Sequence, residues 1–261
     1  TNRDSWVYNS SRSALRSNVE RMTDFFNDQV DQSTSGHWTP DNDPTRFSWN
    51  RADQTRIRKR QKLEVEPTGY RVSTYRPFNR QQVYFRPEAN DMVYQLERLF
   101  PAPDVQNFGF YVHGQSANSE FALLAVDQLP CLDLFGRGGQ SSPRYSFTDQ
   151  NESDNLLDAA ADDGQPYRRI DNITDEILAE YRESFGEVSK DDIFFYVYGL
   201  LHSPAYREQY QADLKKMLPR IPKVKTFLDF SEAGRKLSEL HLGYESVDPY
   251  PLEATEPLDP S

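Results

Sequence analysis

The spacing of apolar side chains changes along this 261-residue chain, and that change limits the possible folds more than any other feature. Before residue 150, short runs of aromatic and β-branched residues lie between proline, glycine and polar residues, which predicts strands at 71–75, 82–85, 108–113 and 121–126. After residue 170, apolar residues recur every three or four positions, which predicts helices at 173–185, 191–202, 204–217 and 227–242. This order predicts an α+β fold, in which a helical C-terminal subdomain braces a sheet-containing N-terminal subdomain.

Two of the expected helices have apolar stripes that predict which face is buried. One helix is expected to begin after Ser10 or Ser11, and its stripe consists of Leu15, Val19, Met22, Phe26 and Val30. In the last expected helix the stripe consists of Phe230, Ala233, Leu237 and Leu240. We expect both stripes to face the core.

An acidic, polar stretch between residues 148 and 170 is the expected boundary between the two subdomains. It divides the chain into a sheet-containing part at 1–150, a helical part at 151–247 and an extended, proline-rich acidic tail at 248–261. The chain opens at Thr1, without an initiator methionine, and runs at once into a strand-like stretch. We therefore expect it to be one domain of a longer polypeptide.

Positive charge is concentrated in one segment of an otherwise acidic chain. The formal net charge is −11, yet residues 44–86 contain 11 basic and 3 acidic side chains. Lys and Arg neutralise phosphates and release condensed counterions, so a basic cluster among aromatic residues is typical of nucleic-acid binding. A solvated helix face is the plainer interpretation. The expected phosphate contacts are Arg51, Arg56, Arg58, Lys59, Arg60 and Lys62.

Several side chains near this segment can present two hydrogen bonds to one base edge. Arginine suits guanine, and asparagine or glutamine suits adenine. The candidates are Asn79, Arg80, Gln81 and Gln82 between the first two strands, with Arg137 and Gln140 in a glycine-rich loop. Candidates for stacking on bases are Trp49, Tyr70 and Tyr75. The competing interpretation is that residues 75–78 form a packed corner that orients the strands.

Motifs for catalysis, cofactor binding and metal binding are absent from the sequence. No glycine-rich turn ends in the Lys and Ser or Thr of a phosphate-binding loop, and no His belongs to an HExxH pair. The single cysteine, Cys131, excludes an internal disulfide and a multi-cysteine zinc site. No apolar run approaches the ~18 residues that cross a bilayer. We expect a cytoplasmic chain that is not itself an enzyme and holds no metal or cofactor.

Several segments together resemble one family, the C-terminal target recognition domains of type ISP restriction-modification enzymes. The likeness covers nearly the whole chain, and its blocks keep the order of the family. They are TNRDSWVYN at 1–9, the basic segment 49–62 leading to YRPFNR at 75–80, FYVYGLLHSPAYR at 195–207, PRIP at 219–222 and LHLGYE at 240–245.

The resemblance implies that this module recognises the double-stranded DNA sequence on which the neighbouring domains of the same polypeptide act. Those domains are an adenine methyltransferase, a nuclease and a helicase-like motor. It also implies that S-adenosylmethionine, ATP and Mg²⁺ bind only in those neighbouring domains. The resemblance assigns no base-reading residues, because these differ with each recognised sequence. The residue candidates above therefore depend on charge and chemistry alone.

Two other functions remain compatible with the residues. The chain could bind RNA or single-stranded nucleic acid, with Trp49, Tyr70 and Tyr75 as stacking platforms. Alternatively, the basic segment could dock on an acidic partner domain, in which case the chain would not bind DNA.

Overall fold

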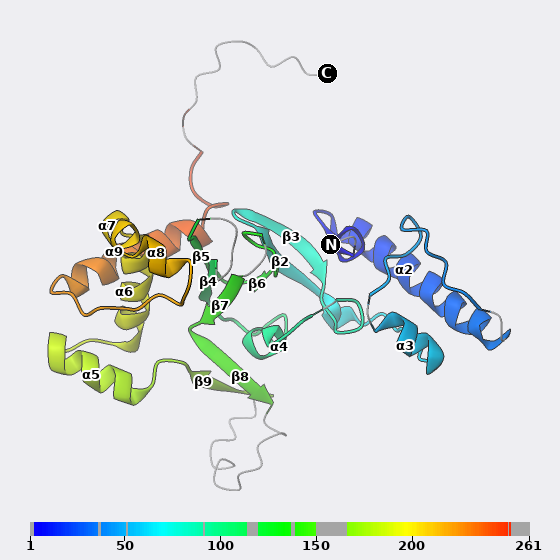
Figure 1. Ribbon diagram of the computed structural model, residues 1–261, viewed down its shortest axis with the longest axis horizontal. Coiled ribbons are helices and arrows are strands. Elements are labelled where there is room, and N and C mark those ends of the chain that lie inside the picture. The colour runs from blue at the N-terminus through cyan, green and yellow to red at the C-terminus, as the bar shows by residue number, and fades with distance from the viewer. Residues whose placement is uncertain are drawn as a thin grey trace, which may run out of the picture.

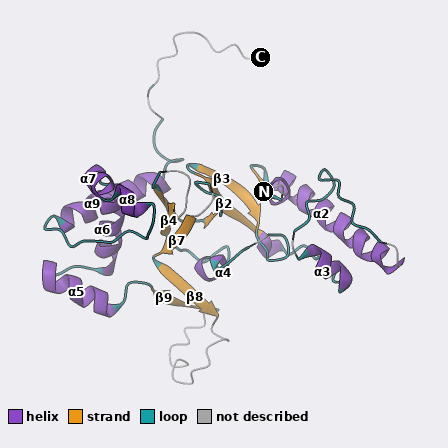
Figure 2. Cartoon of the chain, viewed as in Figure 1, coloured by secondary structure: helices purple, strands orange, loops and turns teal. Residues whose placement is uncertain are grey.

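The computed structural model describes residues 3–35, 38–50, 52–90, 92–113, 120–136, 139–149, 166–249 and 251. Its elements form three groups along an elongated molecule (Figure 1), with N-terminal helices at one end, β-strands in the middle and C-terminal helices at the other end. Figure 2 shows the same division by type of secondary structure. The α+β class predicted from the sequence, with its helical C-terminal part, is confirmed.

The N-terminal end is built around one long helix. α2 (Arg12–Gln32) begins after Ser11, whose Oγ accepts a hydrogen bond from the Ala14 amide. Every residue of the predicted α2 stripe is buried, and the stripe packs in one cluster with Phe47 and Ile57. The shorter elements around it are α1 (Asp4–Val7), α3 (Asp53–Arg58) and two 3₁₀ turns at Ser33–Ser35 and Pro67–Gly69.

The first sheet has the strand order β1-β3-β2-β6. β2 (Tyr70–Arg76) and β3 (Asn79–Tyr84) are the first two predicted strands, and they form an antiparallel hairpin. β1 (Tyr8–Asn9) pairs with β3, and β6 (Leu129–Pro130) runs parallel to β2 at the other edge. Three distant segments of the sequence therefore meet in one sheet.

A second sheet and a separate hairpin occupy the middle of the molecule. The sheet has the order β5-β4-β7, formed by β4 (Gly109–His113), β5 (Leu123–Val126) and β7 (Gly139–Pro143). The hairpin consists of β8 (Tyr145–Asp149) and β9 (Tyr167–Asp171). β7, β8 and β9 were not predicted, because few of their residues are apolar. The proposed division at residue 150 falls between β8 and β9, which pair across it.

The helices α5 (Asp175–Phe185), α6 (Lys190–His202), α7 (Pro204–Gln209), α8 (Gln211–Leu214) and α9 (Phe227–Leu242) form the C-terminal end. A capping box begins α6, because Ser189 and Asp192 exchange hydrogen bonds between side chain and backbone. α6 is buried almost throughout and contributes most of the largest core cluster, which also includes Phe110 and Leu123 of the second sheet. The predicted segment 204–217 is divided into α7 and α8.

The buried face of α9 matches the predicted one only in part. Ala233 is exposed and Leu240 is 55% exposed, whereas Ser231, Gly234 and Ser238 are buried. α9 crosses α6 so closely that a Cβ atom added to Gly234 would lie 2.0 Å from the Phe195 carbonyl oxygen. Small residues permit this approach at the centre of the contact, while Phe230 and Leu237 of the predicted stripe are partly buried and pack against the same core cluster.

Candidate nucleic-acid interface

The helix α3 lies within the basic segment 44–86 and is anchored by a buried ion pair. The Arg3 guanidinium donates to Asp53, whose side chain is fully buried and also accepts from the Asn50 amide at 2.7 Å. Burial raises the pKa of Asp53, although the charge of Arg3 opposes that rise. Arg56 lies on the same side, 3.5 Å from Asp53 and 3.4 Å from the Glu88 carbonyl oxygen. Arg56 is therefore partly buried and holds α3 in place.

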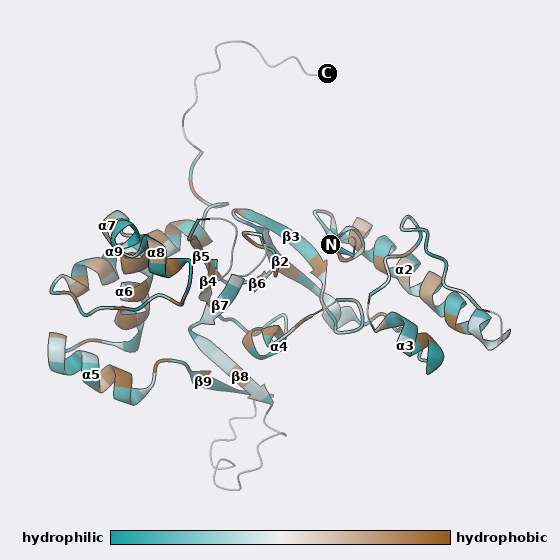
Figure 3. Cartoon of the chain, in the orientation of Figure 1, coloured by the Kyte–Doolittle hydropathy of each residue, from teal (hydrophilic) through white to brown (hydrophobic). Residues whose placement is uncertain are grey.

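The last residue of this helix and the two residues after it present their charges to solvent. Arg58, Lys59 and Arg60 are exposed, and none of them forms an ion pair within the described part of the chain. Arg60 has a φ of +55°, a left-handed conformation that ends α3 and turns the chain back. Figure 3 shows that α3 is largely hydrophilic. Three cations thus lie together on a short, solvent-exposed turn.

The two remaining members of the predicted phosphate-binding set differ from this cluster. Lys62 is exposed and lies 2.9 Å from Asp31, whose carboxylate is also exposed. Such a surface pair contributes about 0–1 kcal/mol, so a phosphate can replace it. Arg51 lies outside the described residues.

The predicted base-reading residues are separated by the fold. Asn79 is exposed at the β2–β3 turn, and Gln140 is exposed on β7. Gln81 and Gln82 are adjacent on β3, so their side chains point to opposite faces of the sheet. Arg137 lies outside the described residues.

Arg80 braces the sheet against the C-terminal end. Its Nη2 atom lies 3.2 Å from Asp127 Oδ1 and donates to the Leu242 carbonyl oxygen at 2.8 Å. Its Nη1 atom lies 3.4 Å from Glu245 Oε2. These contacts join β3 to the end of α9, which gives Arg80 a structural role that its position in the sequence did not indicate.

The predicted stacking residues have protein groups against their rings. Trp49 donates to the Asp41 carbonyl oxygen at 2.7 Å and packs on Phe47. Tyr70 is 8% exposed and packs on Tyr84. Tyr75 is half-buried, with the Arg76 guanidinium 4.0 Å from its ring centroid. Stacking on a base requires an open ring face, so the structure places these three rings in packing roles.

A cleft of about 1090 Å³ was not anticipated from the sequence. Its walls are the β2–β3 hairpin, the segment 100–108, the β8–β9 hairpin and the end of α9. The lining includes three arginines from separate parts of the chain, Arg12, Arg71 and Arg169, together with Gln82 and Tyr145. The signals of this site in the sequence were the basic segment 44–86, to which Arg71 belongs, and the candidates Gln82 and Tyr70, which also line the cleft.

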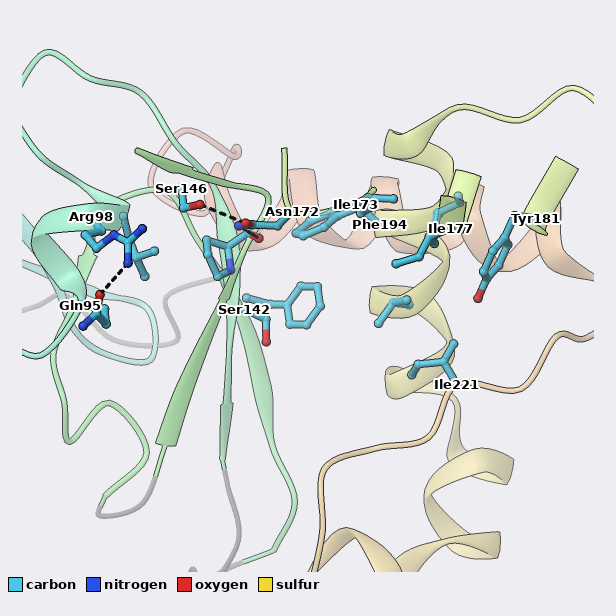
Figure 4. Close-up of a pocket in the computed structure, with 15 residues that line it drawn as sticks. Gln95, Arg98, Ser142, Ser146, Asn172, Ile173, Ile177, Tyr181, Phe194 and Ile221 are labelled. Carbon is cyan, nitrogen blue, oxygen red and sulfur yellow. Dashed lines mark hydrogen bonds between the residues drawn. The ribbon is translucent and has the colours of Figure 1, made fainter. Parts of the chain in front are cut away.

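A second cavity, of about 610 Å³, lies where the second sheet and the β8–β9 hairpin meet α5 and α6 (Figure 4). Its wall towards the helices is apolar and includes Ile177 of α5, Phe194 of α6 and, just before α5, Ile173. Arg98, on the opposite side of the cavity, is its one charged lining residue among those described. This lining fits a polyanion less well than the cleft does.

Among the described residues, no group of three His, Cys, Asp or Glu side chains is placed to hold a metal ion. None of the described helices is long and apolar enough to span a membrane.

The chain is similar to a known family and to several solved proteins. It matches the family described as the Type ISP C-terminal specificity domain over residues 1–261. The DrdV–DNA complex, determined by cryo-EM, is 33% identical, with a TM-score of 0.83 over 97% of this chain and 23% of the other.

Two further solved structures are similar. A nuclease-deletion mutant of the Type ISP restriction-modification enzyme LlaGI, in complex with a DNA substrate mimic, is 30% identical, with a TM-score of 0.79 over 95% of this chain and 22% of the other. The ATP-dependent Type ISP restriction-modification enzyme LlaBIII bound to DNA is 28% identical, with a TM-score of 0.77 over 94% and 15%. No curated protein matches the chain significantly. The chain spans less than a quarter of each solved chain.

Proposed function

The chain belongs to the Type ISP C-terminal specificity domain family, and we propose that it selects the double-stranded DNA sequence on which a restriction-modification enzyme acts. The observation that carries this proposal is the exposed cluster of Arg58, Lys59 and Arg60, three cations that have no acidic partner among the described residues of a chain of net charge −11. The similarity to proteins solved in complex with DNA supports it. Phosphate contacts from this cluster would set the position of the duplex, and other side chains would read the bases.

The wider activity belongs to neighbouring domains in this proposal. The module would direct an adjacent adenine methyltransferase, a nuclease and a helicase-like motor, and S-adenosylmethionine, ATP and Mg²⁺ would bind in those domains. The chain itself would perform no catalysis. It would act in the cytoplasm, where bacterial DNA lies.

A salt titration tests the proposal with the 261-residue chain and a labelled mixed-sequence duplex. We expect the variant Arg58→Glu, Lys59→Glu, Arg60→Glu to bind the duplex more weakly. The log-affinity against log-salt slope should fall by about 2.7, from roughly 0.9 for each lost phosphate contact. A control, Lys215→Glu, Lys216→Glu, Arg220→Glu, makes the same change in net charge at another exposed site. It should change the slope by less than about one unit.

The other outcomes argue against duplex recognition or against the role of the cluster. Preference for a single strand of the same sequence over the duplex would favour single-stranded nucleic-acid or RNA binding. No duplex binding at low salt would refute the proposal and favour docking of the basic segment on an acidic partner domain. Equal losses of duplex affinity in the variant and its control would show that binding depends on the net charge of the chain and not on the cluster.

A further inference from the structure

The large cleft contains an arginine that is held in place without a carboxylate partner. Arg71 donates to the carbonyl oxygens of Phe100 at 2.6 Å and Ala102 at 2.9 Å. It forms no ion pair with any acid in the described part of the chain, and its burial lowers the pKa of its guanidinium. Asp104 and Glu97 oppose this lowering through their charge, without an ion pair to Arg71. A half-buried cation of this kind is stabilised when an anion enters the cleft.

The other two arginines extend this positive site along the cleft. Arg169 lies on β9, and its guanidinium is 4.4 Å from the ring centroid of Tyr145. This cation–π contact holds the exposed Arg169 against the cleft wall. Arg12 is exposed at the start of α2 and forms no ion pair among the described residues.

The acids of the cleft limit the path of a bound polyanion. Asp127 is paired with Arg80 and does not repel a phosphate as a free carboxylate does. Asp104 and Glu239 are exposed and have no ion-pair partner among the residues that the structure describes. A phosphodiester backbone is therefore expected to run past the arginines and away from these two acids. A carboxylate can still accept a hydrogen bond from a cytosine amino group.

Gln82 supplies a group that can read a base. It lies within β3, opposite Val72, and its side chain lines the cleft. Its amide makes no hydrogen bond to another described residue, although the side chain is half-buried. An unpaired amide of glutamine matches the two hydrogen-bonding groups on the major-groove edge of adenine.

We propose that this cleft holds one side of the recognised DNA duplex. Arg71, Arg169 and Arg12 contact its phosphodiesters, and Gln82 contacts the major-groove edge of an adenine. The inference rests on the proposed function and adds the site at which the sequence is read. The cluster at the end of α3 then contributes affinity, and Gln82 contributes specificity.

The test begins with enrichment of preferred sequences by the 261-residue chain from a pool of duplexes with a randomised segment. Binding of the preferred duplex and of single-base variants is then compared for wild type, Gln82→Ala and Gln81→Ala. Gln81 is the matched control because it is the neighbouring glutamine on the opposite face of the same strand. We expect Gln82→Ala to lose about tenfold or more of its discrimination at one A·T position, and Gln81→Ala to lose none.

A second pair of variants tests the phosphate contacts without disturbing the bonds of Arg71. Arg12→Gln and Arg169→Gln should each lower the salt slope by about 0.9. Full discrimination in Gln82→Ala, or an equal loss in Gln81→Ala, would overturn the inference. So would unchanged salt slopes in both arginine variants. If these variants behave as wild type while the α3 triple variant loses affinity, the proposed function stands and the cleft inference alone fails. If wild type binds no duplex, both fail.

Discussion

The crossing of α6 and α9 makes the replacement of Gly234 by alanine a sharp test of the packing. The added Cβ would lie 2.0 Å from the Phe195 carbonyl oxygen and 2.7 Å from the Gly199 nitrogen. Both atoms belong to the backbone of α6, so no side-chain rotation relieves the overlap. The helices must separate by about 1 Å or more before ordinary contact distances return.

The magnitude follows from two opposing contributions. Alanine in a helix interior is favoured over glycine by about 0.8–1 kcal/mol. Overpacking of a closely packed interface costs about 1–3 kcal/mol, and occasionally more. Because the contact is with rigid backbone, we expect the overpacking to prevail. With an overpacking cost in the upper part of its range, about 2–3 kcal/mol, Gly234→Ala should lower the free energy of unfolding by about 1–2 kcal/mol. The melting temperature should fall by about 2–4 °C per kcal/mol for a chain of this size.

The assay is urea or thermal unfolding followed by circular dichroism, with Ala233→Gly as the control. Ala233 is exposed and adjacent to Gly234 on the same helix, so its replacement measures helix propensity without any packing change. It should cost about 0.5–1 kcal/mol. A Gly234→Ala protein as stable as wild type, or more stable, would refute the close crossing of the two helices.

Two other predictions concern buried charge. Burial lowers the pKa of His202 to about 4 from its usual 6.5, so the unfolded chain takes up this proton first and stability should fall as the pH drops from 6.5 towards 4. His202→Gln should flatten this dependence in urea midpoints measured at intervals between pH 7 and pH 4.5, and an unchanged slope would exclude His202 as its source. Arg144 is 3% exposed and joins Asp171 to Asp191, which are themselves partly exposed. Arg144→Met should therefore lower the free energy of unfolding by about 1.5–3 kcal/mol in the same assay, and a loss under about 0.5 kcal/mol would contradict a bracing role.

Local patterns were sufficient for much of the fold. The stripe of α2, from Leu15 to Val30, and its start at Ser11 follow from helical spacing and capping, which depend on neighbours within one helix. The first four predicted strands appear as β2 to β5, because each is a short apolar run bounded by turn residues. The basic cluster from Arg58 to Arg60 was also identified in the sequence, because charged side chains at the surface need no packing partner.

The remaining features depended on which surfaces meet. Where α9 crosses α6 most closely, its buried residues are Ser231, Gly234 and Ser238, because the α6 backbone leaves no room there for larger side chains. The strands β7 to β9 contain too few apolar residues to be recognised, and backbone pairing defines them. Arg80 was predicted to read bases, and only the arrival of Asp127 and Leu242 beside it gives it a bracing role.

The sequence by itself therefore determined the α+β class, the main helices and strands, and the position of the basic cluster. Tertiary structure alone assembled the cleft, because Arg12, Arg71, Gln82, Tyr145 and Arg169 belong to different elements. The physical reason is the range of the interactions. Periodicity, capping and turn chemistry act over a few residues, whereas a cleft exists only after distant surfaces have packed together.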